Sequence, residues 1–266
     1  MRNDYGGTFN NTATITIGAT ASVGLYGIYN STTFNNTGGA IKIDNSTTTG
    51  LLNSDGPFTN VATITIGATT SVGMYGVYNS SIFNNTEGEI KIDRSTDVGL
   101  SNAGGTFTNT AKITIGAVAS VGGSGLLNEA TFNNNAGEIK IDRSTQVGFL
   151  NKNNFNNAAK ITIGATASVG NRGLVNDGGA FANTAGGEVY IISSITPPLE
   201  VGLFNTGGGT LTNVAKIKVD GATNGIRNLN SSFQNNANGE IKIDNATRGV
   251  FNESGSMTNL AKLSIK

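Results

Sequence analysis

Acidic residues that recur beside lysine are the side chains best suited to chemistry in this sequence. Asp44, Asp93, Asp142 and Asp244 each end a Gly-x-Ile-Lys-Ile-Asp segment. Cleavage of a glycosidic bond requires two opposed carboxylates in a groove, whereas these acids repeat at one phase of a sequence period. Histidine, the most common general base, is absent. The pattern indicates a solvated stripe of mixed charge that discourages aggregation, so we predict no catalytic residue and no enzyme.

Sequence signatures of cofactor and metal binding are also missing. No Gly-x-x-x-x-Gly-Lys-Ser/Thr segment occurs, so Gly207-Gly208-Gly209 indicates a turn and not a phosphate cradle. The Gly-Gly-x-Gly-x-Asp calcium repeat and cysteine are absent. Because 17 basic and 17 acidic residues cancel, no attraction to nucleic acid or to an anionic membrane is implied. We therefore expect no cofactor, no metal site, no nucleic-acid partner and no membrane insertion.

Outward-facing threonines suggest a different use of the surface, which is ice binding. Thr14 and Thr16 face outward in one class of repeat, and equivalent threonines recur in later copies. An ice-binding face would require an uninterrupted array, and Lys42 and Lys91 interrupt this one every other turn. Ice binding is therefore the third of three functional hypotheses.

Four tyrosines form a further candidate surface. Tyr26 and Tyr75 occupy one phase of the repeat, and Tyr29 and Tyr78 occupy another. Exposed aromatic rings at equivalent positions serve either as a protein interface or as a platform for a sugar. We favour the interface.

A repeat that fills the chain must position all of these side chains. It opens at Phe9-Asn10-Asn11 and returns about every 24 residues, with Leu211 and Met257 replacing the aromatic residue in two copies. An Ile-x-Ile pair follows, and then glycine, an apolar residue, any residue and asparagine. Alternate residues share one face, which is typical of a strand with one buried side.

Three short strands per turn with no helix signal predict an all-β fold. We predict a parallel β-helix, or β-solenoid, of about eleven turns, right-handed as such folds usually are. Residues 1–266 would form a single continuous domain. Turns with Ala-x-Ile-x-Ile-Gly-Ala alternate with turns that carry Gly-x-Ile-Lys-Ile-Asp, so the true repeat is a pair of turns of about 49 residues. This alternation helps to set the register.

Asparagines end two strands of each turn, on the buried side by strand parity. Stacked about 4.8 Å apart, their amides could bond to one another and to the corner backbone, which would offset the cost of burying them. We predict two structural ladders with these members: Asn11, Asn36, Asn60, Asn85, Asn109, Asn134, Asn157, Asn183, Asn213, Asn235 and Asn259 in one, and Asn30, Asn53, Asn79, Asn102, Asn128, Asn151, Asn176, Asn205, Asn228 and Asn252 in the other.

One insertion interrupts the repeat, around residues 193–200. The chain needs 30 residues to pass from Phe181 to Leu211, and the excess contains two prolines, which cannot donate ladder hydrogen bonds. We expect a loop here, with Pro197, Pro198 and Leu199 as candidate contact residues.

No capping segment is evident beside the first and last copies, so we expect the coil to continue in a longer array or to join other subunits end to end. The segments Phe-Asn-Asn-Thr, Ile-Thr-Ile-Gly and Gly-Glu-Ile-Lys-Ile-Asp-x-Ser-Thr resemble the Asn/Thr/Gly-rich repeats of very long bacterial extracellular fibre and adhesin proteins. Among these, the chain is similar to the hook-like grappling appendages of filamentous predatory bacteria.

The resemblance implies an extracellular, cell-surface location. We expect a load-bearing structural segment of a filament or adhesin, whose partners are copies of itself, flanking repeats of the same chain or cell-surface glycans. The second hypothesis is a carbohydrate-binding or polysaccharide-cleaving β-helix.

Overall fold

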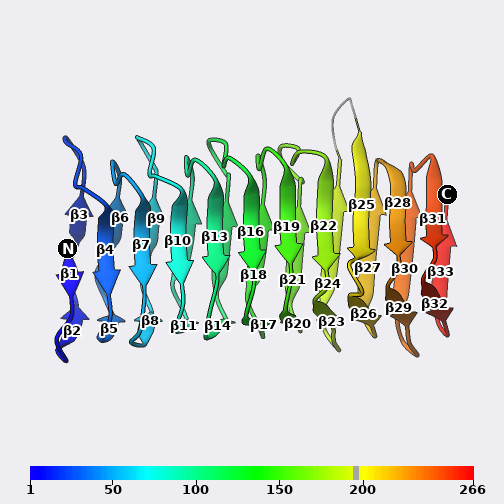
Figure 1. Cartoon of the computed structure of the whole chain (residues 1–266), viewed down its shortest axis with the longest axis horizontal. Coiled ribbons are helices and arrows are strands. Elements are labelled where there is room, and N and C mark those ends of the chain that lie inside the picture. The colour runs from blue at the N-terminus through cyan, green and yellow to red at the C-terminus, as the bar shows by residue number, and fades with distance from the viewer. Residues whose placement is uncertain (194–197) are drawn as a thin grey trace.

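The computed structural model describes residues 1–193 and 198–266, and these residues form a three-sided β-solenoid. The turns follow one another along a straight axis from the N-terminal to the C-terminal end (Figure 1). Each turn contributes one strand to each of three parallel sheets of 11 strands, so the all-β prediction of three strands per turn is confirmed. Among the described residues no helix is long and apolar enough to cross a membrane.

Sheet A contains the strands that end the Gly-apolar-x-Asn segments, together with the short strand of Asn3. They are β1 (Arg2–Asn3), β4 (Tyr26–Asn30), β7 (Thr49–Asn53), β10 (Tyr75–Asn79), β13 (Val98–Asn102), β16 (Ser124–Asn128), β19 (Val147–Asn151), β22 (Arg172–Asp177), β25 (Leu199–Thr206), β28 (Ala222–Leu229) and β31 (Arg248–Glu253).

Sheet B contains the strands that open each copy. They are β2 (Thr8–Asn11), β5 (Thr33–Asn36), β8 (Phe58–Asn60), β11 (Ile82–Asn85), β14 (Thr106–Asn109), β17 (Thr131–Asn134), β20 (Asn154–Asn157), β23 (Ala180–Asn183), β26 (Thr210–Asn213), β29 (Ser232–Asn235) and β32 (Ser256–Asn259).

Sheet C contains the Ile-x-Ile strands. They are β3 (Ile15–Ile17), β6 (Ile41–Ile43), β9 (Ile64–Ile66), β12 (Glu89–Ile92), β15 (Lys112–Ile115), β18 (Glu138–Ile141), β21 (Lys160–Ile163), β24 (Glu188–Ile192), β27 (Lys216–Asp220), β30 (Glu240–Asp244) and β33 (Lys262–Ile265).

Equivalent residues of successive turns lie side by side. Phe83 of β11 pairs with Phe58 of β8 and with Phe107 of β14. The rings stack inside the solenoid, with 4.7 Å between the ring centres of Phe58 and Phe83 and 4.6 Å between those of Phe83 and Phe107. Side chains alternate between the two faces along each strand, and the same residue types return once per turn. Equivalent side chains therefore form columns along the solenoid.

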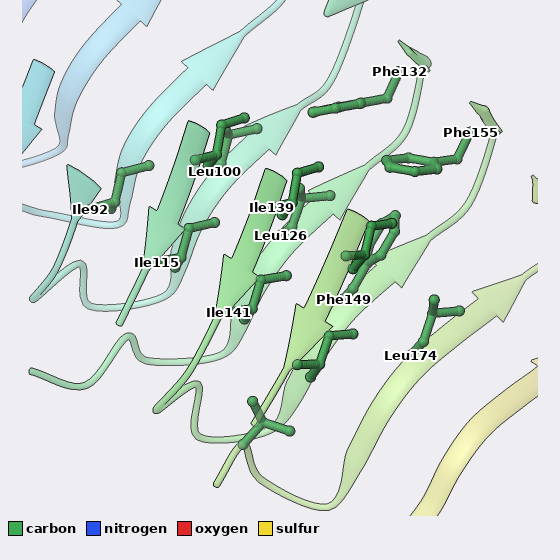
Figure 2. Close-up of a cluster of buried hydrophobic side chains, with 14 of the residues drawn as sticks. Ile92, Leu100, Ile115, Leu126, Phe132, Ile139, Ile141, Phe149, Phe155 and Leu174 are labelled. Carbon is green, nitrogen blue, oxygen red and sulfur yellow. The ribbon is translucent and has the colours of Figure 1, made fainter. Parts of the chain in front are cut away.

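The three sheets share one hydrophobic core. Ile92, Ile115 and Ile141 line up on successive strands of sheet C, and Leu100 and Leu126 of sheet A point into the same interior (Figure 2). All five side chains are fully buried. Each turn adds only one strand to each sheet, so its inward side chains are exposed unless the turns on either side cover them. The copies are therefore stable only when stacked.

A glycine near the start of most strands of sheet A lets two sheets approach each other. A Cβ on Gly27 would lie 2.3 Å from Ile43 Cγ2 and 2.6 Å from the carbonyl oxygen of Gly50. On either side of Gly27, Tyr26 and Ile28 pair with Thr49 and Leu51 of the next turn. Of these two side chains Ile28 is in the core and Tyr26 is half-buried.

Candidate functional site

Two unbroken columns of asparagine run through the interior of the solenoid. In sheet A the Nδ2 atom of Asn79 donates to Oδ1 of Asn102 at 2.8 Å, and Asn102 donates to Asn128 at 2.9 Å. Equivalent bonds of 2.7–2.9 Å join every neighbouring pair from Asn3 to Asn252. The column is polar, because each amide donates toward the C-terminal end and accepts from the turn before.

The second column lies where sheet B ends. Asn85 donates to Asn109, and Asn109 donates to Asn134, both at 2.8 Å. The same bond, at 2.7–2.8 Å, recurs from Asn11 to Asn259. The structure thus shows the asparagine ladders that strand parity predicts.

In most members of the two columns the amide nitrogen also donates to a backbone carbonyl at a corner. Asn109 Nδ2 also donates to the carbonyl of Ala111 at 3.0 Å, and Asn30 Nδ2 donates to that of Thr32 at 2.8 Å. In a member such as Asn109 both amide hydrogens and the oxygen are therefore occupied. This complete satisfaction allows the side chains to be fully buried without the penalty of an unpaired polar group.

Asn3 is a ladder member that the sequence analysis missed. It donates to Asn30 at 2.8 Å and to the carbonyl of Thr33 at 2.9 Å. Met1 stands two residues before it, as Ile28 does before Asn30, but the glycine of the Gly-apolar-x-Asn pattern has no counterpart in the sequence. The spacing of 27 residues from Asn3 to Asn30 is the signal that could have identified it.

The prediction that the aspartates of the Gly-x-Ile-Lys-Ile-Asp segments form a solvated stripe is wrong. Asp44, Asp93 and Asp142 are buried, with 8, 6 and 0% of their surfaces exposed. Asp93 Oδ1 accepts the backbone N–H groups of Val118 and Ala119, both at 2.9 Å. These carboxylates lie beneath the corner of the following turn, where they satisfy two adjacent amides.

The same arrangement recurs at the other two aspartates. Asp142 accepts from the amides of Thr166 and Ala167, at 3.0 and 3.2 Å. Asp44 binds the amides of Thr69 and Thr70, at 3.1 and 3.2 Å. The fourth member, Asp244, instead pairs with Lys242 at 2.6 Å and is 9% exposed.

The residue after each of these aspartates binds the preceding corner. Arg94 donates to the carbonyls of Gly67, at 2.8 Å, and of Ala68. Arg143 makes the equivalent contacts with Gly116, at 3.0 Å, and Ala117, and Asn45 binds Gly18. These residues have positive φ values of 51–56°, which non-glycine residues rarely adopt. In the turns before and after each of these dipeptides, a longer corner joins the Ile-x-Ile strand to the next strand of sheet A. We name the Asp44-Asn45, Asp93-Arg94 and Asp142-Arg143 dipeptides the corner clips, because each binds the long corner of the turn before it and that of the turn after it.

Glutamate and lysine alternate along the outer face of sheet C. The paired positions read Glu89, Lys112, Glu138, Lys160, Glu188, Lys216, Glu240 and Lys262. Lys112 Nζ lies 3.0 Å from Glu89, and Lys160 Nζ lies 3.0 Å from Glu138. These lysines belong to the other class of turn, and the sequence analysis did not assign them to this face.

The lysines shift the titration of this charge ladder. Burial opposes ionisation of Glu89, but Lys91 and Lys112 outweigh that effect and lower the pKa of the Glu89 carboxyl. The bond from Lys262 lowers the pKa of Glu240, and the bond to Glu138 raises the pKa of Lys160. The charged forms of both partners are therefore favoured along the face.

The outer face of sheet A is apolar and aromatic. The tyrosine pairs of the sequence analysis contact each other within each strand, with 5.8 Å between the ring centres of Tyr26 and Tyr29 and 4.9 Å for Tyr75 and Tyr78. All four side chains are half-buried. Leu25, 61% exposed, lines a shallow depression beside Tyr26 and Tyr29.

Arginines cover aromatic rings farther along the same face. The guanidinium carbons of Arg172 and Arg227 both lie 5.1 Å from the centre of the Phe204 ring. Val175, Val201 and Phe204 form a small hydrophobic cluster on this side, separate from the main core. The face therefore changes from tyrosine-rich near β4–β10 to arginine-capped near β22–β28.

The expected contact loop is only partly described. Pro197 lies outside the described residues, and Pro198 is exposed. The prediction that Leu199 is a contact residue of the loop is wrong, because Leu199 begins β25 and is 2% exposed, within the main core. Its strand pairs with Ala222 of β28, so the backbone has already rejoined the sheet at this residue.

Among the described residues no three acidic side chains gather as metal ligands, and histidine and cysteine are absent from the chain. No family model, curated protein or solved structure matches the chain.

Proposed function

We propose that the chain is a load-bearing structural segment of an extracellular bacterial filament or adhesin, such as an attachment or grappling appendage. The observation that carries the proposal is the continuity of both asparagine columns, which link all turns from Asn3 to Asn252 and from Asn11 to Asn259. These bonds lie between turns, along the long axis of the molecule (Figure 1).

The geometry suits tension along that axis. Each turn is joined to the next by three strand ladders and by two buried amide bonds that act in parallel. To separate two turns, a force must break these bonds together and expose stacked phenylalanine and isoleucine side chains to water. Such a rod resists extension more strongly than a chain of domains joined by single linkers.

Sheet A offers the surface for lateral association of copies. The tyrosines, together with exposed Leu25 and Met74, form an aromatic and aliphatic patch, and the Arg2 guanidinium lies over Tyr29 at its N-terminal edge. Aromatic residues and methionine are enriched at the centres of protein interfaces. Equivalent patches on neighbouring rods would bundle them, while the charged face of sheet C would remain in solvent.

Electron microscopy of the native assembly tests this proposal. We expect rods or bundles in which the solenoid axis follows the filament, and discrete monomers would refute it. Tyr78→Ser, on strand β10 of the tyrosine patch, should reduce bundling, whereas Thr65→Ser on sheet C should leave it unchanged.

A carbohydrate-binding role is the second candidate, supported by the paired tyrosines beside the depression at Leu25. Binding of soluble oligosaccharides that is lost in Tyr29→Ser would favour it. Release of reducing ends from polysaccharides would instead indicate cleavage.

A further inference from the structure

The three outer faces of the solenoid differ sharply in charge. Sheet C carries the ladder of glutamate and lysine, and sheet A carries arginines over aromatic rings. In contrast, the 11 strands of sheet B, all within the described part of the chain, contain no lysine, arginine, aspartate or glutamate. The chain has 34 such residues, so their exclusion from one whole face indicates a surface with a distinct use.

Small hydrogen-bonding side chains occupy most outward positions of sheet B, and the exceptions include Ile82 of β11 and Ala180 and Ala182 of β23. Two such positions occur in most strands, and at the centre of the sheet these are Thr106 and Thr108 on β14 and Thr131 and Asn133 on β17. They are partly exposed, while the intervening phenylalanines are in the core. In-register pairing places Thr106 beside Thr131 and Thr108 beside Asn133.

The result is a regular grid of hydroxyl, amide and methyl groups. Neighbouring strands are about 4.8 Å apart, and outward residues of one strand are about 6.6 Å apart. Eleven strands extend this face for about 50 Å, and the strands β14, β17 and β20 at its centre carry a hydroxyl or amide group at both outward positions. Some amides are held along the columns, since Asn35 donates to Asn10 and Asn156 donates to Asn133, both at 2.9 Å.

This grid complements a surface that is uncharged, periodic and rich in hydrogen-bonding groups. Hydroxyl and amide groups both donate and accept hydrogen bonds, and bonds through ordered water are nearly as favourable as direct ones. A charged side chain would have to give up its strong hydration on such a surface, which is costly. A polysaccharide surface would also require outward aromatic rings for stacking, and the phenylalanines of sheet B are turned inward.

We propose that the outer face of sheet B binds ice, through the two outward columns that include Thr106, Thr131, Thr108 and Asn133. Ordered water held on the hydroxyl, amide and methyl groups joins the flat lattice of an ice face. The interrupted threonines of sheet C, such as Thr65 between Lys42 and Lys91, do not take part. The inference is independent of the filament role, because a monomeric solenoid presents the same face.

A matched pair of variants tests the assignment. Thr108→Glu places one negative charge at the centre of sheet B, between Asn84 and Asn133. Thr65→Glu places the same charge on sheet C, between the positively charged Lys42 and Lys91, which can pair with it. Both threonines are half-buried at outward positions of strands with a neighbour on either side, so the variants differ chiefly in the face that they alter.

The measurement is incorporation of the protein into a slowly growing ice hemisphere, supported by inhibition of ice recrystallisation. We expect the wild type and Thr65→Glu to enter the ice and Thr108→Glu to lose most of this uptake. Circular dichroism checks that each variant is folded, and Asn156→Lys, on a more exposed part of the same column, repeats the test if Thr108→Glu melts early. Exclusion of the wild type from ice, or equal uptake of all variants, would overturn the proposal. Binding to insoluble cellulose or chitin that Thr108→Glu abolishes, without uptake into ice, would also overturn it.

Discussion

At the scale of single residues, the columns explain why asparagine recurs where an apolar residue would be expected. A side-chain amide has two donor hydrogens and one acceptor oxygen. It can accept from the turn before, donate to the turn after and donate to its own corner, as Asn109 does with Asn85, Asn134 and Ala111. Aspartate would lack the donors, and serine would be too short to span two turns.

We therefore expect Asn109→Ala to destabilise the protein by about 1–3 kcal/mol for each buried group that loses its partner. The amide of Asn85 would lose its acceptor, and Oδ1 of Asn134 would lose its donor. Urea denaturation of the variant and of the wild type measures the change in the free energy of unfolding. Asn133→Ala is the control, because Asn133 faces outward and its loss should cost less than about 0.5 kcal/mol. Equal effects of the two variants would contradict a structural role for the column.

At the scale of elements, the corner clips join strands that belong to different turns. A long corner follows β9, and the short corner after β12 lies directly against it. Gly67, with a φ of 70°, opens the long corner, and a Cβ on it would lie 1.8 Å from the carbonyl oxygen of Asp93. Glycine is therefore required both for its backbone conformation and for space. The clips hold these corners by side-chain bonds where the sheets provide no ladder.

Asp93→Ala should loosen the following corner without unfolding the solenoid. The amides of Val118 and Ala119 would lose their buried acceptor, and hydrogen bonds to a charged group are worth about 1.5–3 kcal/mol. Hydrogen exchange should accelerate at these two amides, while the amides of β15 remain protected. Asp97→Ala, which removes an exposed carboxylate from the same short corner, is the control. Unchanged exchange in Asp93→Ala would show that the clip has no influence on the corner.

The charge ladder of sheet C predicts a specific sensitivity to acid. The folded state lowers the pKa of Glu89 below its ordinary value of 4.5. The ion pairs with Lys91 and Lys112 therefore stabilise the protein fully above that value, and this contribution is lost as the pH falls through the lowered pKa. Because the pairs are near the surface, we expect at most about 1 kcal/mol. Thermal melting between neutral and acidic pH should show a smaller loss of stability in Glu89→Gln than in the wild type. Parallel pH profiles for the two proteins would contradict this assignment.

At the scale of the whole molecule, the alternation of two kinds of turn sets the order of stacking. Turns with a clip are always flanked by turns with a long corner, as Asp93-Arg94 is by the corners that begin at Gly67 and Gly116. Glutamate and lysine alternate with the same period. A shift by a single turn would place long corner against long corner and remove the clip between them.

Two deletions test this two-turn register. Removal of residues 83–106 takes out one turn and brings the long corners at Gly67 and Gly116 together, whereas removal of residues 58–106 takes out two turns and leaves Asp44 below the corner at Gly116. We expect the longer deletion to melt near the wild-type temperature and the shorter deletion to melt lower and less cooperatively. Thermal denaturation followed by circular dichroism measures the melting temperatures of the two deletion variants and the wild type. Equal melting temperatures would show that turns are interchangeable.

The sequence alone determined the solenoid, its three strands per turn, its core residues and the inward direction of the asparagines. These features follow from a local period of two within strands and from identical copies, because equal segments can satisfy one another only by stacking in register. Asn79 and Asn85 could thus be assigned to the interior before any contact was known.

Only the tertiary structure decided which residues of neighbouring turns contact each other at the corners and on the outer faces. Strand parity places Asp93 on the same side as Lys91 and cannot show that the next turn covers it. The pairing of Glu89 with Lys112, the burial of Leu199 and the lack of charge across sheet B likewise depend on neighbours about 24 residues away. A strand's own sequence specifies which of its side chains point outward, but the adjacent turns determine whether those side chains meet solvent, an opposite charge or a buried amide.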